Sequence, residues 1–124
     1  MVVLTRCQLI GVTRGLEYLH DIGIVHGNLK SVSGGSFCLS TLPLNSHDPS
    51  PQRNILIDEA GIPRLHGFWN SSSCPVRYCA PERLEFGGKG RATCESDVYS
   101  LSMVIVEVCR FQGMYFYLNH IFLF

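Results

Sequence analysis

Chemically useful residues gather in the stretch VHGNLKS, which runs from Val25 to Ser31. The stretch has the form of a loop that holds a catalytic acid, yet Asn28 stands where the acid would be, with His26 and Lys30 on either side. An amide can orient a substrate hydroxyl, but it has no lone pair basic enough to take a proton near neutral pH. Taken alone, Lys30 is explained equally well as a solvated surface charge. The loop can therefore position a hydroxyl group but cannot deprotonate it.

Two helices are predicted on either side of this loop. The first runs from Thr5 to Asp21, where apolar residues recur at steps of three and four and so share one face: Leu9, Val12, Leu16 and Leu19. The second runs from Glu95 to Cys109, with Thr93 or Ser96 as its N-cap. Its apolar residues cover most of the circumference, which is typical of a helix buried on nearly all sides: Val98, Leu101, Val104, Ile105 and Val108.

A small β-hairpin is predicted between the helices. Two short apolar runs in the segment Asn54–Leu65 flank Asp58-Glu59-Ala60-Gly61, and Gly61 can take the positive φ that such a turn often needs. The expected fold class is therefore mainly α with a small β-hairpin, an α+β arrangement within a single domain. A chain of 124 residues is long enough for one hydrophobic core.

Composition excludes several classes of partner. Ten basic residues balance ten acidic ones, so no net positive field attracts nucleic acid or anionic lipid. The apolar run MYFYLNHIFLF is shorter than the roughly 20 residues that span a bilayer, so no membrane helix is expected. The start of the chain lacks the features of a signal peptide, and six cysteines without a C-x-x-C pair are typical of free thiols. The expected compartment is the cytoplasm.

The loop resembles the catalytic loop of the protein kinase family, which reads H-R-D-L-x-x-x-x-N and precedes a strand. With residues 32–52 set aside, the chain reads VHGNLKS-RNILID, which keeps His26, Leu29, Lys30 and Asn54 in the family's register. Asn28 then falls on the catalytic aspartate. The resemblance implies that His26 supports the fold, that Lys30 could face a phosphate, and that Asn54 is a weak candidate for an oxygen ligand to a metal ion.

The stretch LHGFW is similar to the family's D-F-G motif, and it follows Asn54 at the family's spacing. Gly67 stands where that motif has its aspartate, and Phe68 and Trp69 follow. In the family this aspartate holds the magnesium ions that neutralise charge on the phosphates. Gly67 has no side chain for that task, and the adjacent His66 is a poor ligand for a hard ion that prefers oxygen. The nucleotide site at Asn54, Gly67 and Phe68 is therefore degenerate.

Two further motifs follow in the family's order. RYCAPE supplies the A-P-E motif, whose residues the resemblance treats as structural: Ala80, Pro81 and Glu82. ESDVYSLSMVIVEV is similar to the buried central helix of the larger kinase lobe, with Asp97 at the position of a structural acid that accepts hydrogen bonds from the catalytic loop. Because the family's arginine partner for Glu82 is not in this chain, Glu82 is expected to face solvent or an improvised partner.

The resemblance covers residues 5–31 and 53–108, which gives a partial kinase-like domain over 1–108 with the fold of a truncated C-terminal lobe. Residues 32–52 are predicted to be an irregular surface insertion, and the hypothesis of a retained intron fits them, because GT…AG codons could encode their Val-Ser-Gly start and Pro-Gln end. Residues 109–124 are interpreted as a tail outside the family. Neither a G-x-G-x-x-G loop nor a strand lysine occurs in the 124 residues, so half of the nucleotide cleft is not represented.

Three functional hypotheses remain open. The first is a kinase-like fragment that is catalytically inactive and at most binds a protein partner through exposed apolar surface. The second is an ATP-dependent protein kinase, acting on serine, threonine or tyrosine, represented here by a partial gene model. The third is an unstable product of a misread gene. The resemblance implies ATP and magnesium as cofactors, but none is expected for this chain, since Asn28 and Gly67 remove the base and the metal-holding carboxylate.

Overall fold

The computed structural model describes residues 6–30, 54–67, 74–85 and 90–121, with only the backbone of residues 6 and 111–121. The predicted insertion at 32–52, Phe68 and Trp69 lie outside the described residues. The described elements are, in order, α1 (Arg6–Asp21), β1 (Ile55–Ile57), β2 (Pro63–Leu65), the 3₁₀ turn η1 (Val76–Tyr78), α2 (Pro81–Leu84) and α3 (Cys94–Ile121). The expected class, mainly helical with a small antiparallel hairpin, is confirmed.

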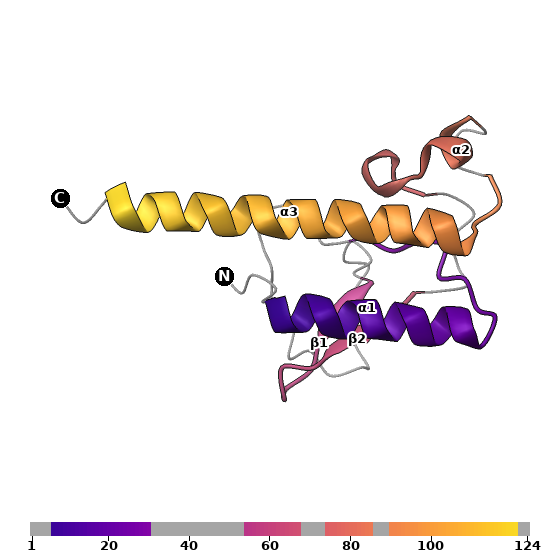
Figure 1. Cartoon of the computed structure of the whole chain (residues 1–124), viewed down its shortest axis with the longest axis horizontal. Coiled ribbons are helices and arrows are strands. Elements are labelled where there is room, and N and C mark those ends of the chain that lie inside the picture. Colours follow the sequence, from indigo (N-terminus) through magenta and orange to yellow (C-terminus); the bar gives the residue numbers. More distant parts are fainter. Residues whose placement is uncertain (1–5, 31–53, 68–73, 86–89, 122–124) are drawn as a thin grey trace, which may run out of the picture.

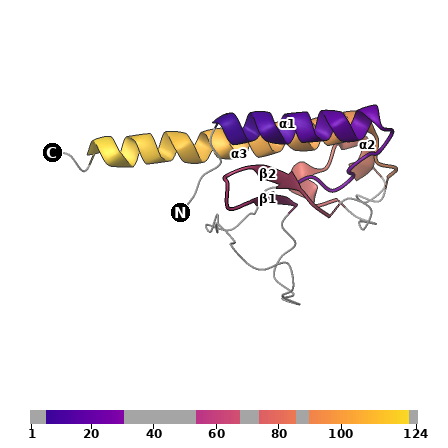
Figure 2. The ribbon, with the colours of Figure 1, turned by 90° about the horizontal axis from the view of Figure 1, so that it is seen from below.

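Helices α1 and α3 run side by side in opposite directions, and the hairpin packs against α1 (Figures 1 and 2). The first turns of α3 therefore lie beside the last turns of α1, where the loop 22–30 leaves that helix (Figure 1). This arrangement brings the chain segment after α1 and the amino-terminal end of α3 to one place, which is where the candidate site forms.

Helix α1 confirms the predicted apolar face. Val12, Leu16 and Leu19 are buried, and Leu9 packs on the edge of the core. The first two join Leu29 from the following loop and Leu101 from α3 in one apolar cluster. The burial of Leu29 in this cluster fixes the loop that carries Asn28, so the position of the site depends directly on packing between the two helices.

The hairpin also agrees with the prediction. Ile55 pairs with Leu65 and Ile57 with Pro63 in an antiparallel register. Its turn is organised by Asp58, whose Oδ1 accepts hydrogen bonds from the N–H groups of Ala60 (3.1 Å) and Ile62 (2.8 Å). These bonds lower the pKa of the Asp58 carboxyl below its ordinary value, with the bond from Ile62 as the largest cause.

The prediction that α3 is buried on nearly all sides is wrong for the described residues. Leu101, Val104 and Val108 are buried, whereas Val98 and Val106 are 57% and 59% exposed. The buried residues recur at the three- and four-residue steps of one face, and the face opposite to it carries the exposed valines. Within the described residues, other segments of the chain therefore cover only part of the apolar surface of α3.

Helix α3 is also longer than predicted, because it continues past Cys109 to Ile121. The apolar period that marks its first half fades there, but a helix needs no such period to keep its backbone bonds. The continuation contains no proline, and its single glycine, Gly113, costs only about 1 kcal/mol relative to alanine. Among residues 6–30, 54–67, 74–85 and 90–121, no helix combines the length and apolar character that crossing a bilayer requires.

Two glycines of α1 provide a matched test of the packing between α1 and β2. A Cβ on Gly11 would lie 2.5 Å from Cγ of Pro63, whereas a Cβ on Gly15 would lie 3.4 Å from Cδ1 of Leu65. We expect Gly11→Ala to lower the free energy of unfolding by about 1 kcal/mol, because overpacking exceeds the gain in helix propensity. Gly15→Ala should be neutral or stabilising by up to about 1 kcal/mol. Urea denaturation measures both, and equal effects of the two variants would contradict the close approach.

Candidate functional site

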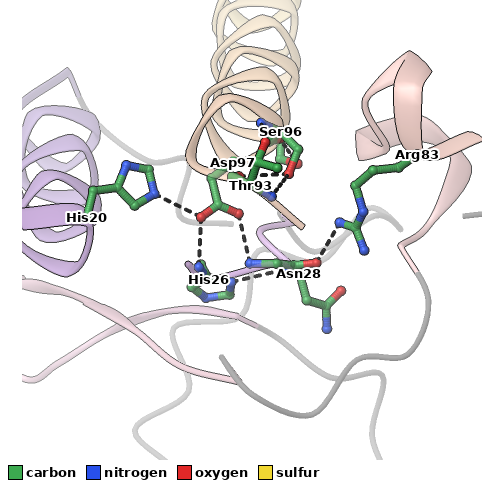
Figure 3. Close-up of polar contacts among 9 residues, drawn as sticks. His20, His26, Asn28, Arg83, Thr93, Ser96 and Asp97 are labelled. Carbon is green, nitrogen blue, oxygen red and sulfur yellow. Dashed lines mark hydrogen bonds and ion pairs between the residues drawn. The ribbon is translucent and has the colours of Figure 1, made fainter. Parts of the chain in front are cut away.

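The carboxylate of Asp97 organises the candidate site. It is 1% exposed and lies in the first turn of α3. Oδ2 accepts hydrogen bonds from the backbone N–H of His26 at 2.7 Å, and Oδ1 accepts from the N–H of Gly27 at 2.8 Å. The Nε2 atom of His20, from the last turn of α1, lies 2.9 Å from Oδ2 (Figure 3). The hydrogen bonds that the sequence predicts for Asp97 are therefore present, and His20 adds a contact that was not predicted.

A capping box holds Asp97 in place. Thr93 is the N-cap residue of α3, and its Oγ1 accepts from the N–H of Ser96 at 3.2 Å. In return, the Oγ of Ser96 accepts from the N–H of Thr93 at 3.0 Å (Figure 3). Reciprocal bonds of this kind satisfy backbone donors that a helix leaves unpaired at its start. Both residues named as possible caps thus take part, and the helix end that presents Asp97 is fixed.

His26 connects the loop to the end of the hairpin. Its Nε2 contacts the backbone carbonyl of His66 at 3.1 Å, and its Nδ1 lies 3.2 Å from the N–H of Asn28. A neutral ring that donates from Nε2 and accepts at Nδ1 satisfies both contacts. Burial, the largest cause, lowers the pKa of His26, although the negative charge of Asp97 opposes the shift. The contacts of His26 with His66 and Asn28 are thus with the backbone, and its lowered pKa favours the neutral ring.

Gly27 is held from both sides. It has φ +75°, and its N–H is bound by Asp97 while its carbonyl accepts from Nη1 of Arg83 at 2.8 Å. Arg83 is 3% exposed and also donates from Nε to the carbonyl of Gly90 at 3.0 Å. Sequence reasoning missed Arg83, because an arginine within a short helix carries no periodic signal that distinguishes a buried side chain from a solvated one.

Asn28, Asn54 and Gly67 lie together at the centre of the site. Asn54 is 1% exposed, and its Nδ2 donates to the backbone carbonyl of Asn28. Asn28 is 5% exposed, and its Oδ1 is buried with no hydrogen-bond partner within the described chain. Gly67 has φ +77°, and a Cβ built on it would lie 2.6 Å from Oδ1 of Asn54. The structure thus brings together the three positions that the sequence singled out for chemistry.

These three residues do not fit a magnesium–nucleotide complex well. Magnesium ions bound with substrate phosphates are held by one or two carboxylates, whereas this cluster offers amide oxygens only. Within the described residues, no group of three or more His, Cys, Asp or Glu side chains could hold a metal ion. A side chain added at Gly67 would require the amide of Asn54 to shift, because a Cβ there would lie 2.6 Å from its Oδ1.

The other predicted site residues are more peripheral. Lys30 is half-buried at the end of the described segment 6–30, and Phe68 lies outside the described residues. Ala80 is buried and forms the N-cap of α2, whereas Pro81 is exposed at its first position. Glu82 is exposed, as expected for a carboxylate without its usual partner.

A second polar cluster joins the segment before α2 to α3 and was not predicted. The hydroxyl of Tyr78 donates to Oε2 of Glu107 at 2.6 Å, and Arg77 lies 3.3 Å from Oε1 of the same residue. The hydroxyl of Ser100 donates to the carbonyl of Tyr78 at 2.7 Å. Glu107 falls on the buried face of α3, so its spacing from Val104 and Val108 was a signal that could have found it.

Comparison with known proteins agrees with this geometry. The family model for protein tyrosine and serine/threonine kinases matches residues 4–118, a span that continues past Val108. The chain belongs to the protein tyrosine and serine/threonine kinase family.

Individual relatives include proteins named as inactive and proteins named as kinases. An inactive leucine-rich repeat receptor-like serine/threonine-protein kinase from Arabidopsis thaliana is 33% identical over 80% of this chain and 14% of its own length. A probable serine/threonine-protein kinase of the same species is 30% identical over 79% of this chain and 24% of its length. The serine/threonine-protein kinase Tao of Drosophila melanogaster is 25% identical over 89% of this chain and 9% of its own length. The chain thus spans less than a quarter of each of these relatives.

Removal of the Asp97 carboxylate tests the anchor. Asp97→Ala would remove the two carboxylate oxygens that accept from the buried N–H groups of His26 and Gly27, and the loss of such a bond costs about 1–3 kcal/mol. We expect a loss of about 3 kcal/mol or more in the free energy of unfolding, measured by urea denaturation. Glu82→Gln, at an exposed position, is the matched control and should change stability by less than about 0.5 kcal/mol. A similarly small effect of Asp97→Ala would show that the loop is held by other contacts.

The lowered pKa of His26 predicts a pH dependence of folding. Because the folded state resists protonation of this ring, the unfolded chain binds the proton more readily once the pH falls below about 6.5. The contribution of His26 to the free energy of unfolding is therefore fully present above that pH and is lost as the pH falls further. Chemical denaturation between about pH 7 and pH 5 should show decreasing stability, with a flatter profile for His26→Gln. Identical profiles for the two proteins would contradict the assignment of a neutral, buried ring.

Proposed function

We propose that this chain is a pseudokinase-like module of the kinase C-terminal lobe type, which does not transfer phosphate and acts at most by binding a protein partner. The observation that carries the proposal is the cluster of Asn28, Asn54 and Gly67, in which no side chain is a carboxylate. The anchor at Asp97 and the packing of Leu29 remain, so the scaffold is retained while its acids are absent.

Asn28 removes the proton acceptor. A general base contributes about 10²–10⁴-fold to a reaction rate, and an amide cannot take its place near neutral pH. The Oδ1 atom of Asn28 is buried, so it can accept a hydrogen bond from a group that enters the site. Such a bond would orient a hydroxyl group without activating it. Replacement of the base alone would leave only trace turnover.

Gly67 removes the carboxylate that holds the metal ion in the family. Electrostatic stabilisation of the transferred phosphoryl group depends on that ion, because phosphoryl transfer needs little covalent participation from the protein. Asn54 can offer one amide oxygen, but its Nδ2 is already bound to the carbonyl of Asn28. We therefore expect neither ATP nor magnesium as a cofactor of this chain.

Exposed apolar residues support a binding role. Val98 and Val106 are more than half exposed on the outer face of α3, and Val76 in the turn η1 is 76% exposed. Continuous apolar surface on a folded domain generally marks a contact with another protein or a tendency to aggregate. We propose a protein partner on this basis, with no role for nucleic acid or for a membrane.

A second candidate function is phosphotransfer by an active protein kinase of which this chain is one part. The similarity to a probable serine/threonine-protein kinase over 79% of the chain favours it, as do Lys30 and Asn54 at the family's positions. Asn28 and Gly67 argue against normal turnover in this case as well, because they stand at the positions of the base and of the metal-holding carboxylate within this chain itself.

Nucleotide binding and phosphate transfer distinguish the two candidates. A ligand that binds only the folded protein raises its melting temperature, so we expect no rise with Mg-ATP and no transfer of radiolabelled phosphate to any protein. A rise in melting temperature together with transfer that disappears in Lys30→Ala would support the active kinase. Absence of any cooperative unfolding would instead favour the unstable product of a misread gene.

Acidic substitutions at Asn28 and Gly67 distinguish the effects of the two residues on phosphotransfer. Asn28→Asp should remain without phosphotransfer, because the metal-holding carboxylate is still missing. Asn28→Asp combined with Gly67→Asp should lower the melting temperature further than Asn28→Asp alone, since Asn54 would have to break its bond to the carbonyl of Asn28 to make space. Easily measured transfer by Asn28→Asp alone would show that Gly67 is not the limiting change.

A further inference from the structure

A stripe of exposed residues runs along α3 on the side that faces away from the core. We call it the α3 stripe, and its members recur at steps of three and four residues: Glu95, Val98, Tyr99, Ser102, Val106, Cys109 and Arg110. At 3.6 residues per turn, these steps keep the stripe within about a third of the helix circumference. The opposite side carries Leu101, Val104 and Val108, which pack against residues of α1 and η1. Within the described part of the chain, the stripe is therefore a helix face without a covering element.

The middle of the α3 stripe is apolar. Val98 and Val106 are more than half exposed, and Tyr99 is exposed as well. Ser102 lies between them, and its hydroxyl donates to the carbonyl of Tyr99 at 2.7 Å, so that this short side chain stays close to the helix backbone. Apolar residues at such steps form the pattern by which one amphipathic helix packs on another. The stripe therefore suits a helix as its occupant.

The charges at the two ends of the stripe indicate which helix fits. Glu95 and Arg110 are both exposed, and neither belongs to an ion pair among the described residues. A bond from its own backbone N–H, the largest cause, lowers the pKa of Glu95, so its carboxylate is charged near neutral pH. Glu95 lies seven residues before Ser102, and Arg110 lies eight residues after it. The acid and the base are thus almost equally far from Ser102, in opposite directions along the helix.

This symmetry fits a second copy of the same helix. If two α3 helices packed in parallel, acid would lie beside acid and base beside base. If they pack antiparallel about a two-fold axis near Ser102, Glu95 of each copy lies beside Arg110 of the other, and two ion pairs form. A two-fold interface uses the same surface of both copies, which is what a stripe with complementary ends provides. The antiparallel direction also places opposite ends of the two helix dipoles beside each other.

We propose that the α3 stripe is the interface of a homodimer, in which the α3 helices of two copies pack antiparallel about a two-fold axis near Ser102. This dimer rests on the proposed function, since it gives the binding role a partner, which is a second copy of this chain. Val98 and Val106 of both copies lose contact with water in the interface. The formal net charge of the chain is zero, so no long-range repulsion opposes the approach of the two copies.

Charge reversal at the ends of the stripe tests the pairing. Sedimentation equilibrium of the full chain without nucleotide should give a mass that rises towards that of two chains as the concentration increases. Glu95→Lys should raise the dissociation constant of the dimer on the order of tenfold, because both ion pairs become repulsive. Arg110→Glu should act similarly, and the two substitutions together should restore the dimer. Glu17→Lys makes the same charge change at an exposed position of α1 and should leave the dissociation constant unchanged.

A cysteine at the two-fold axis gives a second readout without any change of charge. Ser102→Cys is prepared in a chain whose Cys7, Cys38 and Cys109 are replaced by serine, and the protein is treated with diamide. Residues at a two-fold axis lie beside their own copies, and a disulfide forms where two Cα atoms come within about 7 Å. We expect a covalent dimer of Ser102→Cys that a reductant separates. Glu17→Cys in the same background should give no such dimer.

Several results would overturn the homodimer. They include a mass of one chain at every concentration, and a dimer that Glu95→Lys and Glu17→Lys weaken equally. Aggregates of undefined size, or a different protein that binds the α3 stripe of a chain that does not self-associate, would overturn it too. The charge series does not depend on Ser102→Cys, so misfolding of that variant would not obscure the result. Phosphate transfer by the dimer would contradict the noncatalytic role but not the interface, so the two proposals fail in separate assays.

Discussion

The buried carboxylate of Asp97 is the contact on which the arrangement of the site depends. A charge that is removed from water must be compensated by donors, and here the loop backbone provides two and His20 a third. The donors come from the last turn of α1 and from the loop that follows it, which the apolar packing of Leu29 against Leu101 also holds beside α3. The carboxylate therefore fixes the end of α1, the loop and the start of α3 relative to one another. The position of Asn28 at the centre of the site depends on this arrangement.

The residues that hold the loop in place and the residues at the catalytic positions contribute differently to the free energy of folding. Loss of Asp97, Leu29 or Arg83 would cost folding free energy, because each is buried and makes contacts that nothing else replaces. Asn28 and Gly67 differ from these residues, because the Oδ1 atom of Asn28 has no hydrogen-bond partner within the described chain and Gly67 has no side chain. A chain that is no longer selected for phosphotransfer can lose residues of the second kind while it keeps those of the first. This pattern agrees with the folded, noncatalytic role that we propose.

Elements set by local patterns could be predicted from the sequence. The face of α1 and the hairpin around Asp58 follow from periodicity and turn chemistry, and the hydrogen bonds of Asp97 follow from its place in a familiar motif. Burial on α3 was overestimated, because periodicity counts apolar residues but does not say what covers them; Val98 and Val106 are exposed. Arg83 and His20 could not be found, since their roles depend on segments that are distant in sequence and meet only after packing.

The contact between Gly67 and Asn54 also bears on the order in which substitutions can occur. With the amide of Asn54 turned towards the glycine, a single codon change that restores an acid at residue 67 meets an occupied space. The amide of Asn54 must shift before such an acid fits, because a Cβ at residue 67 would lie 2.6 Å from Oδ1 of Asn54. An acid at residue 67 is therefore coupled to the conformation of Asn54, and a substitution at either position changes the space available to the other.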